Sequence, residues 1–388
     1  MAIGSRSRST SDGDFLRIIA DTGPVSRTTL AQISGLAPST VSVRVEELIL
    51  GGLLTESTDG QSSGGRRPRL LQLRADGGVV LAADLGTTHA RFAVADLLGR
   101  LITVVEEPIE LSKGPAAILP FVADRLEALA APMLDRSRVV RALGIGLPGP
   151  VDHINGRVTT PSRMPGWHQS EVATTLSERL SVPVVVDNDA NLMAVGEYVS
   201  RGSTVQHLVA VKLGTGIGCG VITGGQVHHG ASGVAGDIGH VRVPDAEPLR
   251  CACGNSGCLE MFASGAGLAM ALRREGRHVT NSADIVQLVR DADPVANTLV
   301  RAAGRHLGEV LAVVVNFFNP EMLVIGGTLA NAEPLIAAVR GSIYERCLPL
   351  ASECIEISTS IAGVDAGIIG ATTVALREAL KVAVAAQQ

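Results

Sequence analysis

The chain has 388 residues, of which 46% are hydrophobic and 18% charged, and its formal net charge is -5. This length exceeds what one ordinary hydrophobic core holds, so we expect two or three domains, and the apolar content excludes an intrinsically disordered chain. Residues 1–76 carry 9 Arg against 8 Asp and Glu, so bulk charge does not identify a nucleic-acid-binding protein and any such contact depends on where the arginines lie.

Targeting signals and cysteine spacing indicate the compartment. No stretch approaches the roughly 20 uninterrupted apolar residues that a membrane-spanning helix requires. The first residues, MAIGSRSRSTSDGD, lack the apolar segment of a secretion signal, so we expect a cytoplasmic protein with no membrane contact. Three of the six cysteines lie in one CxCxxxxC segment, which indicates metal binding in a reducing compartment rather than a disulfide framework.

Three short helices are predicted at the N-terminus. Apolar residues at helical spacing mark the first, over residues 14–20. The second follows its N-cap Ser26 and ends near Gly35, which permits a tight turn, and Pro38 lies in the first turn of the third. Two short helices joined by a glycine turn predict a helix-turn-helix. The third helix would read base edges in the major groove through Ser39, Thr40, Ser42 and Arg44.

A hairpin is predicted directly after this helix-turn-helix. The segments LLTE and RPRLLQL can pair as two strands around the polar loop STDGQSSGG. This hairpin would form a wing whose return strand carries Arg66, Arg67 and Arg69, which suit phosphates or the minor groove. The alternative is a solvated edge strand that resists aggregation. The position behind a helix-turn-helix favours DNA contact.

From Val79 the sequence changes to apolar strands separated by glycine turns, so we place a domain boundary near Asp76 and divide the chain into residues 1–76 and 77–388. Backbone amides in such turns can hold phosphate oxygens, and a carboxylate at the end of the first strand can hold the water shell of Mg²⁺. Short glycine turns also occur in ordinary hairpins. The candidate phosphate or nucleotide positions are Asp84, Gly86, Thr87, Gly214, Thr215, Gly216, Gly326 and Gly327.

A further carboxylate lies where a strand leads into a helix. The strand VPVVV continues through AspAsnAspAla into a helix that starts near Ala190. This junction is a usual place for chemistry in α/β proteins. Asp189 could therefore accept a proton from a substrate hydroxyl as a general base, and the alternative is that Asp189 only caps the helix.

The richest set of ligand side chains falls between Gly236 and Glu260. Imidazole and thiolate groups suit tetrahedral Zn²⁺, and this segment supplies the four protein ligands of a closed structural site, with no open position for catalysis. The predicted ligands are His240, Cys251, Cys253 and Cys258. Asp237 and Glu260 are left to bind something else.

Five motifs follow one another along residues 77–388: GxGxPGxVD, NDAN, GTGIGxG, GxIGH and CxCGxxGCxE. With SRxxLAxxxGLxxSTVS and GGRRPRLL in the head, they cover nearly the whole chain. On these motifs the chain resembles the ROK family of sugar kinases and sugar-responsive repressors, and its head resembles that of the repressor branch. The resemblance implies an α/β body with the two-lobed, actin-like ATPase (ribonuclease H-like) fold, divided into lobes of roughly residues 77–190 and 191–388.

The resemblance also implies roles for residues. Asn188, Asp189, His240 and Glu260 match positions that contact sugar hydroxyls or organise the sugar site, Asp189 matches the catalytic base, and the zinc motif matches over 240–258. One departure is Asp237, which stands where the family usually has glutamate, so a contact with sugar could be longer or bridged by water. Another is Arg163, which would suit a phosphorylated or acidic sugar or lie as an ordinary surface residue.

We expect a transcriptional regulator, most simply a repressor, that binds operator DNA with its head and a sugar or sugar phosphate in its body. A homodimer would present two reading helices to two half-sites. An ATP-dependent sugar kinase with an added DNA-binding domain is the alternative, because the phosphate turns and Asp189 are retained, and this function would need ATP and Mg²⁺. A metal sensor is disfavoured, because four closed ligands suit a structural ion.

Overall fold

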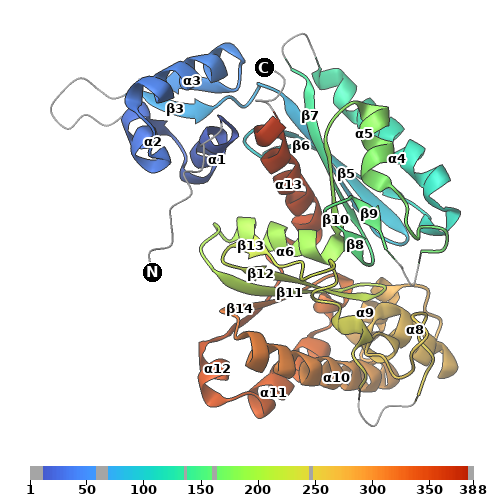
Figure 1. The fold of residues 1–388 in the computed structure, drawn as a ribbon. Coiled ribbons are helices and arrows are strands. Elements are labelled where there is room, and N and C mark those ends of the chain that lie inside the picture. Colours follow the sequence, from blue (N-terminus) through green and yellow to red (C-terminus); the bar gives the residue numbers. More distant parts are fainter. Residues whose placement is uncertain (1–11, 58–68, 135–137, 160–163, 244–247, 383–388) are drawn as a thin grey trace.

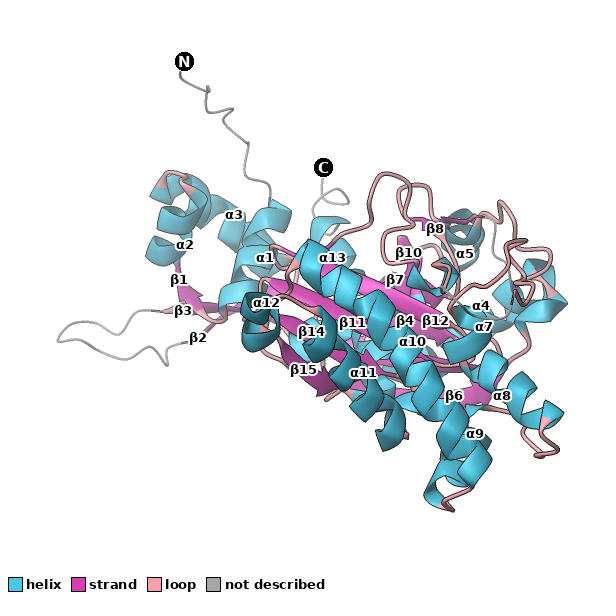
Figure 2. Cartoon of the chain, turned by 90° about the horizontal axis from the view of Figure 1, so that it is seen from below, coloured by secondary structure: helices cyan, strands magenta, loops and turns pink. Residues whose placement is uncertain are grey.

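The computed structural model describes residues 12–57, 69–134, 138–159, 164–243 and 248–382. A small N-terminal head lies beside a large body of two lobes (Figure 1). In the view from below, the head lies at one end of the body, and helices α8 (Gly265–Arg274) and α9 (Ser282–Arg290) lie at the other (Figure 2).

The head consists of short helices and a small sheet. Its elements are α1 (Asp12–Thr22), β1 (Val25–Ser26), α2 (Arg27–Ser34), α3 (Pro38–Leu50), β2 (Leu54–Ser57) and β3 (Leu70–Leu73). The Ser26 hydroxyl accepts a hydrogen bond from the Thr29 amide at 3.1 Å, and Gly35 ends α2 with φ of 70°. The three predicted helices and the hairpin are confirmed. Strand β1 was not expected, and it pairs antiparallel with β3.

The first lobe is built on a sheet with strand order β10-β7-β4-β5-β6. Strands β4, β5 and β6 form an antiparallel meander, and β7 and β10 add in parallel to its other side. Helices α4 and α5 pack together beside this sheet (Figure 1). The elements are β4 (Val79–Leu85), β5 (His89–Asp96), β6 (Leu101–Pro108), α4 (Pro115–Ala130), β7 (Val140–Leu147), β8 (Val151–Asp152), β9 (Arg157–Val158), α5 (Val172–Leu180) and β10 (Val184–Asn188).

The second lobe repeats this plan. Its sheet has the order β13-β12-β11-β14-β15, again with an antiparallel meander on one side and parallel strands on the other. Further elements are α6 (Asp189–Ser200), β11 (His207–Leu213), β12 (Ile217–Thr223), β13 (Gln226–Val227), α7 (Glu260–Ala263), α10 (Pro294–Phe318), β14 (Met322–Gly326), α11 (Glu333–Arg346), α12 (Pro349–Cys354), β15 (Glu356–Thr359) and α13 (Ala366–Val382). The predicted glycine turns at Gly86 and at Gly214 to Gly216 each join the first two strands of one meander, so the two sheets are related.

Helices α6 and α13 lie between the two sheets (Figure 1). They approach each other so closely at Gly196 that a Cβ atom added to this residue would lie 1.9 Å from the Ala366 carbonyl oxygen. The sequence places α13 within residues 191–388, the expected second lobe, yet this helix packs against β4 and β7 of the first lobe as well as against α6. The chain therefore returns to the first lobe at its end.

The core of the head is continuous with the body. Phe15, Leu16 and Ile19 of α1 share one buried cluster with Ala375 and Ala379 of α13. These aliphatic and aromatic contacts exclude water, so the head packs against the body in addition to its covalent connection. Among the residues that the structure describes, no helix has both the length and the apolar character needed to cross a membrane.

Candidate functional site

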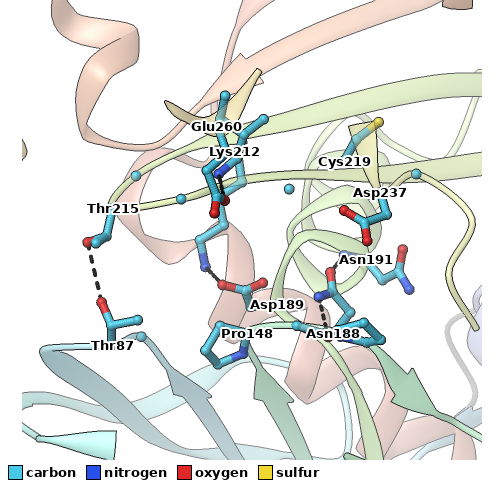
Figure 3. A pocket seen from close by; sticks show the side chains of 18 of the residues that line it. Thr87, Pro148, Asn188, Asp189, Asn191, Lys212, Thr215, Cys219, Asp237 and Glu260 are labelled. Atoms are coloured by element: carbon cyan, nitrogen blue, oxygen red, sulfur yellow. Dashed lines mark hydrogen bonds and ion pairs between the residues drawn. The ribbon is translucent and has the colours of Figure 1, made fainter. Parts of the chain in front are cut away.

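A pocket of about 170 Å³ lies between the two lobes. It is lined by the β4–β5 turn, the loop after β7, the junction of β10 with α6, the β11–β12 turn and the segment before the cysteines (Figure 3). Segments that lie far apart in the sequence thus meet in one place. The predicted residues that line the pocket are Asp84, Gly86, Thr87, Asn188, Asp189, Gly214, Thr215, Gly216, Asp237, His240 and Glu260.

Three charged side chains, those of Asp84, Asp189 and Lys212, meet in the pocket. Figure 3 shows Lys212 beside Asp189. The Lys212 ammonium, from β11, donates to Asp189 with an Nζ–Oδ2 distance of 2.9 Å. Its Nζ also lies 3.7 Å from Oδ1 of Asp84, an ion pair across the two lobes. Asp84 and Asp189 have only 12% and 14% of their side chains exposed. The predicted Mg²⁺ holder and the predicted base are therefore both paired with one lysine.

The ionisation of these groups follows from their burial and mutual charge. Burial raises the pKa of Asp84, Lys212 opposes this effect, and the nearby Asp189 carboxylate adds to it, so the pKa lies above its usual range. Burial alone would lower the pKa of Lys212, but Asp189 and Asp84 outweigh it and the pKa of the ammonium is raised. Lys212 is therefore a permanent cation at neutral pH.

Asn188 organises the start of α6. Its Oδ1 accepts hydrogen bonds from the amides of Ala190 at 2.9 Å and Asn191 at 3.3 Å, and its Nδ2 donates to the Gly149 carbonyl at 2.8 Å. The alternative role considered for Asp189, the N-cap, therefore belongs to Asn188, and Asp189 is the first residue of the helix. This leaves the Asp189 carboxylate directed into the pocket.

Asp237 and Glu260 form part of the opposite wall (Figure 3). Burial raises the pKa of Asp237, with His240 opposing the shift and Glu260 adding to it. Glu260 is 5% exposed, and its Oε2 accepts a hydrogen bond from the Ile217 amide at 3.2 Å. This wall thus presents carboxylate oxygens, which suit hydroxyl groups of a polar ligand.

The predicted phosphate turns face each other across the pocket. The Thr87 hydroxyl donates to the Thr215 hydroxyl at 3.3 Å, so the two turns touch through their side chains (Figure 3). Gly326 and Gly327 are not among the residues that line this pocket. They lie at and just beyond the end of β14, where Gly327 has φ of 84° and a Cβ added to it would lie 2.4 Å from the Leu213 carbonyl oxygen. Their role in nucleotide binding stays a prediction.

The four predicted metal ligands lie together. The ligand atoms of His240, Cys251, Cys253 and Cys258 all lie within 4.8 Å of one another. The separation is 3.6 Å from His240 Nδ1 to Cys251 Sγ and 3.7 Å between the Cys253 and Cys258 sulfurs. Tetrahedral Zn–S bonds of about 2.3 Å place two sulfurs roughly 3.8 Å apart, and a disulfide would need about 2.0 Å. The cluster therefore fits a metal ion, and its four ligands close the site.

Helix α3 presents part of its predicted reading surface. Val41, Val45 and Leu48 are buried in the head, and Ser39 and Thr40 are exposed. Arg44 is half-buried, and its guanidinium lies 5.8 Å from the centre of the Phe15 ring. Ser42 is half-buried as well.

The wing strands pair as expected, with Leu54 opposite Leu73. Arg69 is 59% exposed and its guanidinium lies 3.4 Å from Glu56. Arg66 and Arg67 lie outside the described residues. An Arg69 that keeps one weak carboxylate contact remains accessible to a phosphate.

Three functional candidates were not predicted from the sequence. Lys212 stands inside a strand pattern, where nothing marks it as a partner of the distant carboxylates Asp84 and Asp189. Asn191 lines the pocket from the first turn of α6. Val43 is 59% exposed on α3. Helical spacing could have identified it, because it follows Ser39 by four residues and Thr40 by three, and an apolar side chain on a reading helix can contact the thymine methyl group.

A winged helix-turn-helix head, two related lobes with a pocket between them and a closed Cys₃His cluster define the class of this protein. The chain belongs to the ROK family, whose model matches residues 80–378. It is similar to the xylose repressor of Bacillus spizizenii, with 29% identity over 371 residues that cover 95% of each chain.

Two solved structures extend the comparison. A ROK family transcriptional regulator, a homolog of the E. coli MLC protein, superposes with a TM-score of 0.80 at 28% identity and covers 97% of both chains. A ROK family glucokinase from Streptomyces griseus, solved with glucose and AMPPNP, gives a TM-score of 0.62 at 28% identity, covering 77% of this chain and 99% of that one. The regulators match nearly the full length, and the kinase matches a smaller share.

Proposed function

We propose that this protein is a sugar-responsive transcriptional regulator of the repressor type. The observation that carries the proposal is the union, in one chain, of a winged helix-turn-helix with a ROK body, matched over 95% of its length by a xylose repressor. A transcriptional regulator accounts for both the winged helix-turn-helix head and the ROK body, whereas a kinase does not account for the head.

The pocket between the lobes is the proposed effector site. Its wall of Asp237, His240 and Glu260 and the opposite residues Asn188 and Asp189 offer acceptors and donors on two sides of a small volume. Sugars present hydroxyl groups in several directions, so such a surface suits a sugar or sugar phosphate. Arg163, which would favour a phosphorylated or acidic sugar, lies outside the described residues.

The Cys₃His cluster is proposed to hold a structural Zn²⁺. His240 Nδ1 faces the Cys251 sulfur, and the same histidine lines the pocket, so its other ring edge remains for the ligand. A closed four-ligand site supplies rigidity rather than catalysis. The ion would hold Asp237, His240 and Glu260 in place, so the proposed role of the zinc is to position the residues of the sugar site.

Helix α13 is the proposed connection between effector and DNA. Near its start, a Cβ added at Gly367 would lie 2.1 Å from Asp84 Oδ2 in the pocket. Near its end, Ala375 and Ala379 pack in the core of the head with Phe15. Seventeen residues at about 1.5 Å per residue span roughly 25 Å. A sugar that binds one lobe arrangement better than another would thus bias the position of the head.

The regulator is proposed to act as a homodimer on operator DNA in the cytoplasm. Two reading helices α3 would enter major grooves about one helical turn apart, through Ser39, Thr40, Ser42 and Arg44. The wing residues Arg66, Arg67 and Arg69 would contact phosphates or the minor groove. Light scattering of the purified protein, alone and on operator DNA, measures the stoichiometry.

Footprinting with genomic fragments tests the proposed function. We expect a protected pseudo-palindromic site that one sugar or sugar phosphate releases, and a variant Ser39→Ala/Thr40→Ala that weakens protection while leaving sugar binding intact. The absence of binding to every genomic fragment at low salt, where phosphate contacts are strongest, would refute a DNA-binding role.

ATP-dependent sugar phosphorylation is the second candidate. It is favoured by the placement of Asp84, Thr87, Thr215 and Asp189 around one pocket and by the likeness to a glucokinase solved with glucose and AMPPNP. ATP would supply the phosphoryl group and Mg²⁺ its charge neutralisation, with Asp189 near the sugar hydroxyl. An ADP-release assay over a sugar panel, with Asp189→Asn as control, measures this activity. Equal turnover in both proteins would remove Asp189 as the base.

A further inference from the structure

Lys212 changes what the pocket can hold. Its Nζ lies 2.9 Å from Asp189 Oδ2 (Figure 3) and 3.7 Å from Asp84 Oδ1, so one ammonium group connects the two carboxylates that phosphoryl transfer would need. Asp84 Oδ1 is buried and has no hydrogen-bond partner in the described part of the chain, and the Lys212 ammonium faces it as an ion pair at 3.7 Å. A buried carboxylate oxygen in this state needs a neighbouring cation, and the lysine provides it.

The residue type supports this interpretation. Only Lys113, Lys212 and Lys381 are lysines among the 33 basic residues of the chain, and the rest are arginines. An ammonium is a compact point charge on a flexible stem, whereas a guanidinium is a broad planar fork. A lysine can therefore occupy the small space between two carboxylates in the way a metal ion does.

A divalent cation does not fit beside this lysine. Mg²⁺ requires about six oxygen ligands at about 2.0–2.1 Å, supplied by carboxylates, waters and phosphates. The ammonium occupies the carboxylate oxygens on one side and repels a second cation only a few ångströms away. With Lys212 charged, the two carboxylates and the ammonium sum to one negative charge instead of two, which weakens attraction for the metal further.

The phosphate turns give a second, independent observation. The hydroxyls of Thr87 and Thr215 hydrogen-bond directly at 3.3 Å, so the space between the two turns is closed at that point. A triphosphate lying between the turns would have to separate these side chains. Mg·ATP would therefore have to displace Lys212 at the cation position and separate the two threonine side chains at the phosphate position.

We infer that Lys212 is an internal replacement for the divalent cation of a ROK kinase, which keeps Asp84 and Asp189 paired and leaves a cleft that binds sugar without Mg·ATP. This inference rests on the proposed sugar site and deepens it. Lys212 also connects the two lobes, because Asp84 belongs to β4 of the first lobe and Lys212 to β11 of the second. The protein is accordingly a sensor whose ligand leaves the cleft unmodified.

Divalent cation binding tests the inference without reference to DNA. Full-length, zinc-loaded protein is titrated with Mn²⁺, a hard cation of similar ligand preference, and free Mn²⁺ is followed by electron paramagnetic resonance. We expect Lys212→Ala to bind one Mn²⁺ at least about tenfold more tightly than the wild type, because a positive charge in direct contact with both carboxylates has been removed. Lys212→Ala/Asp84→Asn should lose this gain, and Lys113→Ala, which removes an exposed lysine, should match the wild type.

Several outcomes overturn the inference. These are tight Mn²⁺ binding by the wild type that Asp84→Asn abolishes, equal affinity in wild type and Lys212→Ala, and sugar-dependent ADP release by the wild type. Lys212→Met, which keeps the stem and removes the charge, replaces the alanine variant if the latter does not fold, and carries the same expectation. Failure of the proposed function would appear separately, as a loss of DNA or sugar binding in the wild type.

Discussion

The close crossing of α6 and α13 makes a sharp prediction about two glycines. Gly196 lies inside α6 and Gly341 lies inside α11, and neither has a positive φ. An alanine Cβ at Gly196 would lie 1.9 Å from the Ala366 carbonyl oxygen, whereas an alanine Cβ at Gly341 would meet no described atom within 4 Å beyond its chain neighbours and the nearby backbone of its own helix. The two Gly→Ala changes therefore share their chemistry and differ in their surroundings.

The magnitudes follow from these distances. Each Gly→Ala change raises helix propensity by about 1 kcal/mol. For Gly341→Ala this is the whole effect, so we expect stabilisation of about 1 kcal/mol. For Gly196→Ala, the distance of 1.9 Å is far inside the 3.4 Å at which ordinary contact begins, so the two helices must move apart. Overpacking of this kind costs about 1–3 kcal/mol and more when backbone must move, so the net effect is destabilising.

Thermal unfolding of both variants, followed by circular dichroism, measures the difference. A change of about 1 kcal/mol corresponds to roughly 2–4 °C in Tm for domains of about 150–250 residues, so the two variants should move Tm in opposite directions. Gly196→Ala should also weaken the release of DNA by sugar, because α13 connects the pocket with the head. A rise in Tm of equal size in both variants would refute the close crossing.

Further predictions concern the cap, the head and the metal. Asn188→Ala should lower the free energy of unfolding by about 2 kcal/mol, since it removes both the N-cap and the hydrogen bond to Gly149. Asn188→Ser should lower it by about 1 kcal/mol, because serine still caps the helix. Equal losses in Tm would contradict this expectation. The Arg27 guanidinium holds the pKa of Glu56 below its usual range. The Glu56 carboxylate therefore contributes its full stabilisation of the head at pH values above the usual pKa of about 4.3, and this stabilisation is lost as the pH falls through the lowered pKa. Glu56→Gln should therefore flatten the acid limb of the Tm–pH curve, and an unchanged limb would argue against the pair. Cys253→Ser should reduce bound zinc, measured by elemental analysis, and weaken sugar binding in calorimetry, and unaltered sugar affinity in a zinc-free protein would contradict a framework role.

The sequence alone determined the features that depend on neighbouring residues. Ser26 and Gly35 specify the ends of α2 by hydrogen bonding and backbone freedom, and the structure has both. The metal ligands fall within one short segment, from His240 to Cys258, so local folding of that segment can bring them together. The two glycine-turn runs likewise determined the two antiparallel meanders, because alternation and turn chemistry are local properties.

Tertiary structure decided the rest. The short strand β1 forms only because β3 offers it a partner, and Asn188 rather than Asp189 caps α6 because of the backbone angles at that junction. Lys212 has no local signal: its meaning comes from the register of β11 and from the packing of the lobes, which place its ammonium between carboxylates of β4 and α6. Contacts of this kind depend on how sheets and helices pack in three dimensions, and residue order does not contain those distances. The sequence thus located the cleft, and the packing of the lobes determined which charge lies at its centre.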